Sequence, residues 1–125
     1  MDPPLTAENE TMTSVTLQLP DELAARVLPM QRWLPTLLRL SLTGFRTPAS
    51  RAAAEVTTFL TQGPTPAQVL AFHVSDETQA RLQRLLVLNQ AGLLGTEEES
   101  ELAELETLET MIVELKASLL AQQKQ

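Results

Sequence analysis

The 125-residue sequence lacks cysteine and tyrosine, and it contains one histidine, one tryptophan and three phenylalanines. The lack of cysteine excludes disulfide bonds and thiolate metal ligands, and it fits a protein that acts in a reducing compartment. Apolar residues make up 43% of the chain, whereas aromatic residues make up only 3%. We therefore expect a core built mainly from leucine, valine and alanine.

Long apolar runs are also missing, because no stretch approaches the roughly 20 residues that a membrane-spanning helix requires. The first residues, MDPPLTAENET, are acidic and lack the basic and apolar regions of a signal peptide. We therefore expect a cytoplasmic location and no membrane partner. Residues 1–12 are polar, contain two prolines and predict a disordered extension. Met12 is an alternative candidate for the start codon.

The sequence offers little for catalysis or metal binding. His73 has no second histidine and no cysteine near it in the sequence to complete a metal-binding motif. The four glycines lie at expected helix ends and form no phosphate-binding loop. The glutamates of residues 97–109 follow a helical pattern, whereas a calcium-binding loop places its ligands around a tight glycine turn. We therefore expect no catalytic residues, no metal and no cofactor, and a protein that is not an enzyme.

The net charge of −7 is unevenly distributed. Residues 96–125 hold eight glutamates and two lysines, whereas residues 12–95 hold seven arginines and five acidic residues. The overall acidity argues against nucleic-acid binding driven by charge alone. The mildly basic middle of the chain leaves room for a local contact with DNA.

Prolines and capping residues divide most of the chain into helices. Proline at a first helical position, or an N-terminal capping residue, predicts helix starts near Pro20, Pro35, Pro48, Pro66, Ser75 and Thr96. Gly44 is expected to end the second helix as a C-terminal cap. Trp33 lies between the first two helices, and we expect it to pack in the core, with exposure to a partner as the alternative.

The C-terminal half predicts a helical hairpin over residues 75–123. The second helix of this hairpin is long, and its apolar residues alternate in steps of three and four, which indicates a narrow seam: Leu105, Leu108, Ile112, Leu115 and Leu119. Thr96 and Glu99 have the spacing of a capping box, in which the glutamate accepts from the threonine amide. The hairpin therefore presents an acidic outer face.

One stretch near the start departs from the helical pattern. In residues 14–19, Val15, Leu17 and Leu19 alternate with Ser14, Thr16 and Gln18, and this period of two predicts a β-strand. An isolated strand is unstable in water, so it must pair with another strand. The apolar run 69–74 is one candidate partner. If that run is helical, the strand must pair with a second copy of the chain.

The stretch TSVTLQLPDELAARV resembles the opening of ribbon-helix-helix proteins, a family rich in bacterial antitoxins and small repressors. The resemblance covers about residues 13–44 and implies a dimer whose two-stranded ribbon enters the major groove of DNA. It implies that Ser14, Thr16 and Gln18 contact bases and that Thr36 lies where the second helix anchors a phosphate. Val15, Leu17 and Leu19 would then form the dimer interface.

The stretch LLVLNQAGLLGTEEESELAELETLE, residues 85–109, resembles an element of small bacterial and cyanobacterial proteins that are often grouped with antitoxin-like genes. The residues that carry this resemblance are Asn89, Gly92, Thr96, Glu97, Glu98, Glu99, Glu101 and Leu102. The resemblance implies a family but no particular activity. Asn89 is suited to polar capping of the hairpin turn, and the acidic face is suited to a basic partner.

The sequence therefore predicts a mainly α fold: a disordered extension at 1–12, a ribbon-helix-helix-like dimerisation module at 13–45, and a helical region at 46–125 that ends in the acidic hairpin. Two functions remain open. The first is an antitoxin-like homodimer that binds operator DNA and a basic, toxin-like protein. The second is a helical interaction or scaffold protein without DNA binding. The acidic residues expected to bind a protein partner are Glu98, Glu101, Glu104 and Glu109.

Overall fold

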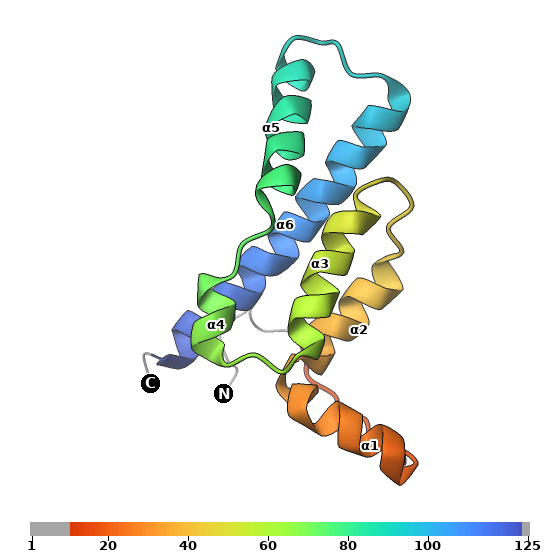
Figure 1. Cartoon of the computed structure of the whole chain (residues 1–125), viewed down its shortest axis with the longest axis vertical. Coiled ribbons are helices and arrows are strands. Elements are labelled where there is room, and N and C mark those ends of the chain that lie inside the picture. The colour runs from red at the N-terminus through yellow and green to blue at the C-terminus, as the bar shows by residue number, and fades with distance from the viewer. Residues whose placement is uncertain (1–10, 124–125) are drawn as a thin grey trace.

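The computed structural model describes residues 11–123, and these residues form helices joined by short connections (Figure 1). The elements are α1 (Asp21–Val27), the 3-10 helix η1 (Leu28–Trp33), α2 (Leu34–Thr43), α3 (Ser50–Thr61), α4 (Pro66–Ala71), α5 (Asp76–Gln90) and α6 (Thr96–Gln123). The prediction of disorder over residues 1–12 falls almost wholly outside the described part of the chain.

The long helix α6 is the axis of the molecule, because α3, α4 and α5 all pack against it (Figure 1). The predicted seam is confirmed: Leu105, Leu108 and Leu119 are buried, and Ile112 and Leu115 are partly buried against the core. Further buried residues of α6, Leu102 and Met111, extend the seam. A helix with neighbours on several sides needs apolar residues around much of its circumference.

Trp33 connects the N-terminal helices to this core, as expected. The side chain is only 2% exposed, and its indole Nε1 donates a hydrogen bond of 2.9 Å to the carbonyl oxygen of Pro64. Beside it, the left-handed turn at Gly63 brings the chain against the carbonyl group of Pro29. These contacts hold η1 against the connection between α3 and α4.

Most predicted helix boundaries are confirmed. Thr65 and Gln68 form a reciprocal capping box at α4, and Ser75 caps α5 by accepting from the Thr78 amide. Gly44 follows α2 with a φ of 70°. Helix α3 begins at Ser50, two residues after Pro48. At α6 the reciprocal bond lies one residue earlier than predicted, because the Gly95 amide donates to Glu98.

The connection between α5 and α6 is a Schellman motif. Gly92 has a φ of 73°, its amide donates to the Asn89 carbonyl, and the Leu93 amide donates to the Leu88 carbonyl. The backbone carbonyl of Asn89 thus takes part in this helix end. The predicted hairpin over residues 75–123 is therefore confirmed (Figure 1).

The predicted N-terminal β-strand is wrong. Residues 11–20 adopt neither strand nor helix, and the structure contains no strand within residues 11–123. The physical reason is the lack of a pairing partner, because a strand requires hydrogen bonds to a neighbouring strand. The candidate run 69–74 instead ends α4 and leads into α5. The resemblance to ribbon-helix-helix proteins fails with the strand, since their ribbon consists of it.

Candidate protein-interaction site

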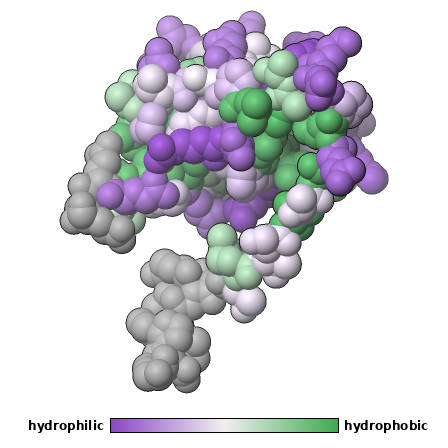
Figure 2. All heavy atoms as spheres, turned by 90° about the horizontal axis from the view of Figure 1, so that it is seen from below, coloured by the Kyte–Doolittle hydropathy of each residue, from purple (hydrophilic) through white to green (hydrophobic). Residues whose placement is uncertain are grey.

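The N-terminal arm, which we define as residues 11–28, carries apolar side chains without a partner in the chain. Val15 is 78% exposed, Leu17 is 69% exposed and Leu28 is 62% exposed. Figure 2 shows the chain beyond the uncertain N-terminal residues as a narrow extension that stands clear of the body of the molecule. Exposed apolar side chains grouped in this way are typical of an interaction surface.

Helix α1 forms the second half of this arm and projects from the lower end of the molecule (Figure 1). Pro20 precedes the helix, Asp21 and Glu22 occupy its first turn, and Arg26 lies in its last turn, which complements the helix dipole. No residue of α1 is buried. Leu23 and Val27 are four residues apart and therefore lie on one face of the helix. This amphipathic helix makes its main contacts with η1 and leaves its apolar face incompletely covered.

The positions expected to bind DNA lie in different surroundings. Ser14, Thr16 and Gln18 are exposed in the extended half of the arm, whereas Thr36 is half-buried in the first turn of α2. Helix η1 runs directly into α2, and the Leu34 amide already donates to the Gln31 carbonyl. The expected dimer residues Val15 and Leu17 are exposed and Leu19 is half-buried. Dimer formation through these residues stays a prediction.

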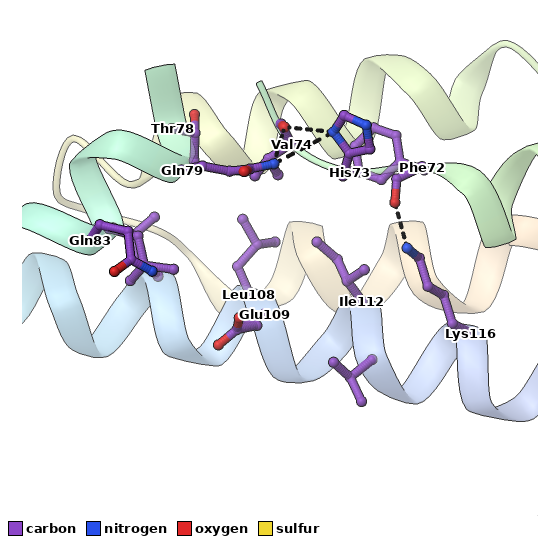
Figure 3. A pocket seen from close by; sticks show the side chains of 13 residues that line it. Phe72, His73, Val74, Thr78, Gln79, Gln83, Leu108, Glu109, Ile112 and Lys116 are labelled. Carbon is purple, nitrogen blue, oxygen red and sulfur yellow. Dashed lines mark hydrogen bonds between the residues drawn. The ribbon is translucent and has the colours of Figure 1, made fainter. Parts of the chain in front are cut away.

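A groove with a volume of about 370 Å³ lies between α5 and α6 (Figure 3). Its apolar lining consists of Phe72, Val74, Leu82, Leu105, Leu108, Ile112 and Val113. Its polar residues are His73, Thr78, Gln79, Gln83, Glu109 and Lys116. Lys116 reaches across one end, where its ammonium group donates to the Phe72 carbonyl oxygen (Figure 3). Sequence analysis missed this groove, although the apolar Val113 directly beside the seam residue Ile112 indicates a wider apolar face.

Glu101, expected to face a partner, is instead buried and paired within the chain. Arg81 of α5 donates to its carboxylate twice, with Nε–Oε2 at 2.9 Å and Nη2–Oε1 at 2.7 Å. The hydrogen bonds from Arg81 lower the pKa of Glu101, because they stabilise its charged form more than burial disfavours it. This fork-shaped pair joins the two helices of the hairpin.

Two further glutamates connect elements in the same way. The carboxylate of Glu104 accepts hydrogen bonds from the Arg46 amide and from the amide and hydroxyl groups of Thr47. Glu55 of α3 accepts from the Ser75 amide and from the hydroxyl groups of Ser75 and Thr78 at the start of α5. Burial by itself would raise the pKa of both glutamates. The hydrogen bonds outweigh burial, so the pKa of each carboxyl group lies below its ordinary value.

The four glutamates expected to bind a partner therefore do not form one free acidic face. Glu98 accepts from the Gly95 amide, and Glu101 and Glu104 bind other parts of the chain. Glu109 is exposed and lines the α5–α6 groove. Of these four residues, Glu109 is the one whose surroundings leave it best placed for a partner.

No family model, curated protein or solved structure matches the chain. Within residues 11–123, no helix is long and apolar enough to cross a membrane. The same part of the chain contains no group of three or more histidine, aspartate or glutamate side chains arranged to hold a metal ion. The candidate site consists of the N-terminal arm, with its exposed apolar residues, and the α5–α6 groove.

Proposed function

We propose that this protein is a non-enzymatic helical interaction protein that docks on another protein chain through its N-terminal arm. The observation that carries the proposal is the group of exposed apolar residues in the arm. The arm contributes no buried residue to the core, since the first buried residue of the described chain is Trp33. Burying such side chains against a partner is favourable by about 25 cal/mol for each Å² of apolar surface removed from water. The second half of the arm is a preformed helix, which lowers the entropic cost of docking.

This proposal follows the second of the two functions predicted from the sequence. The antitoxin-like function with operator DNA depends on a β-ribbon, and residues 11–20 form no strand. Glu109 is exposed and is suited to a basic protein partner, whereas Glu101 and Glu104 are engaged within the chain. The cytoplasmic location remains a prediction from the sequence.

The proposal is tested by affinity capture from the native cells, with wild-type protein and arm variants compared side by side. Leu17→Glu and Leu28→Glu each place a charge on an exposed arm position, so the fold of the body is preserved. Leu93→Glu, at an exposed position in the connection between α5 and α6, is the matched control.

We expect the arm variants to lose proteins that the wild type and the Leu93→Glu control both capture, second copies of the chain included. Capture of the same proteins by all the variants would overturn the proposal. Circular dichroism and thermal melting establish that each variant is folded before the capture is compared.

A further inference from the structure

The chain has two incompletely covered apolar surfaces, the α1 face of the arm and the α5–α6 groove. We propose that α1 of one copy docks in the α5–α6 groove of a second copy. This inference rests on the proposed function and narrows it to one partner. The groove lies between two helices of the body, and a helix that lays its apolar side chains into such a groove is a common mode of protein recognition.

The dimensions of the two surfaces agree. At 1.5 Å per residue, the seven residues of α1 span about 10 Å. The groove is lined along α6 from Leu105 to Lys116, a length of about 16 Å. Leu23 and Val27 lie one helical turn apart on the same face of α1. Ile112, which is half-buried, and Val113, which is exposed, supply the apolar surface on which these two side chains would pack.

The charges of the two surfaces are complementary in one orientation. The groove has Lys116 near one end and Glu109 about two helical turns away toward the other. Helix α1 has acidic residues, Asp21 and Glu22, in its first turn and Arg26 in its last turn. When α1 lies antiparallel to α6, the acidic turn meets Lys116 and Arg26 meets Glu109. The parallel orientation would bring like charges together, which is unfavourable.

The same contact made twice closes a two-fold dimer. Each copy donates its α1 and accepts the α1 of the other copy, so the two contacts are identical and neither α1 nor the groove is left without a partner. Docking also places Leu23, which is 42% exposed in the single chain, against Val113, which is 58% exposed. Both side chains thus lose contact with water in the dimer.

Sedimentation equilibrium of the full chain tests this arrangement, with the variants Leu23→Glu and Val113→Glu. Both positions are exposed in the single chain, so a carboxylate there is compatible with folding. Each variant is expected to raise the dimer dissociation constant about tenfold or more, because docking would bury an unpaired charge. Val87→Glu, an exposed position of α5 that does not line the groove, is the control and should leave the constant unchanged.

Mixing the two variants gives the decisive result. A heterodimer of Leu23→Glu and Val113→Glu chains keeps one intact arm and one intact groove in contact, so the mixture should associate more tightly than either variant alone. A wild type that is monomeric at every concentration tested would overturn the inference, as would a dimer that Val113→Glu does not weaken. In the latter case, a dimer weakened by Leu23→Glu alone would support the arm as the docking element. The proposed function would then stand, since it fails only if arm variants capture the same proteins as the wild type.

Discussion

Gly63 meets two requirements at the point where the arm joins the body. Its φ of +70° lies in the left-handed region, and a Cβ atom there would lie 2.7 Å from the Pro29 carbonyl oxygen. The atom that this Cβ would meet is a backbone oxygen, so the contact cannot be relieved by the movement of a flexible side chain. Gly44 has the same φ, but nothing lies within 4 Å of the position of its Cβ. A comparison of the two glycines therefore distinguishes the cost of the left-handed backbone, which both share, from the cost of the steric contact, which only Gly63 has.

We predict that Gly63→Ala destabilises the protein more than Gly44→Ala does. Each change costs about 1–2 kcal/mol for a left-handed alanine. Gly63→Ala adds about 1–3 kcal/mol because η1 must move away from the turn. Urea unfolding of both variants, followed by circular dichroism at one protein concentration, measures the difference. Equal losses of stability in the two variants would show that the chain relaxes around position 63 without strain.

The helices were largely predictable from the sequence because their starts and ends depend on neighbouring residues. Thr65 with Gln68 and Ser75 with Thr78 are local capping contacts, and local spacing is enough to predict them. The strand predicted in residues 14–19 is wrong, because local spacing is not enough to predict a strand. Alternation of apolar and polar residues describes two faces, but a strand also requires a hydrogen-bonding partner that a local pattern cannot supply.

The roles of the glutamates in α6 depend on contacts between distant residues, which explains why sequence analysis misjudged them. Glu101 binds Arg81, which is 20 residues away, and Glu104 binds Thr47, which is 57 residues away. Helical spacing places both glutamates on one side of α6 but does not show what covers that side. The α5–α6 groove was missed for the same reason, because its walls come from segments that only the fold brings together.

The orientation of α1 against the α5–α6 groove gives a prediction at the scale of the element. In the antiparallel orientation Arg26 meets Glu109 of the second copy, so Arg26→Glu should weaken the dimer. The double variant Arg26→Glu/Glu109→Arg reverses both charges and should restore much of the affinity. Such a pair at the rim of an interface contributes about 0.2–1 kcal/mol, and the two-fold dimer contains two of them, so the dissociation constant should change by about twofold to thirtyfold.

Sedimentation equilibrium at low salt measures this effect, since salt screens exposed charges. Arg51→Glu, on the exposed side of α3, makes the same change of charge away from both surfaces and serves as the control. If Arg26→Glu and the double variant formed dimers with the same affinity, that result would contradict the antiparallel orientation.

At the scale of the whole molecule, three carboxylates join the helices into one body. Glu55 connects α3 with α5, Glu101 connects α6 with α5, and Glu104 connects α6 with the segment before α3. These three acidic residues therefore have a structural role. Each of the three has a pKa below the ordinary value of 4.5 in the folded chain. Their stabilisation is therefore present above the pKa of the unfolded chain and is lost as the pH falls through the lower folded pKa.

We predict that the free energy of unfolding falls as the pH is lowered below about 4.5, and that Glu101→Gln reduces this dependence. At pH 7 the substitution should cost about 2 kcal/mol, because it removes a charge-assisted pair whose arginine remains partly in water. At low pH the wild-type carboxylate is protonated too, so the two proteins should converge in stability. Urea unfolding across the pH range measures both curves, at one protein concentration because dimer formation would change apparent stability. Glu106→Gln, which removes the same charge at an exposed position of α6, is the control. A Glu101→Gln curve parallel to that of the wild type would show that the Arg81 pair does not link folding to pH.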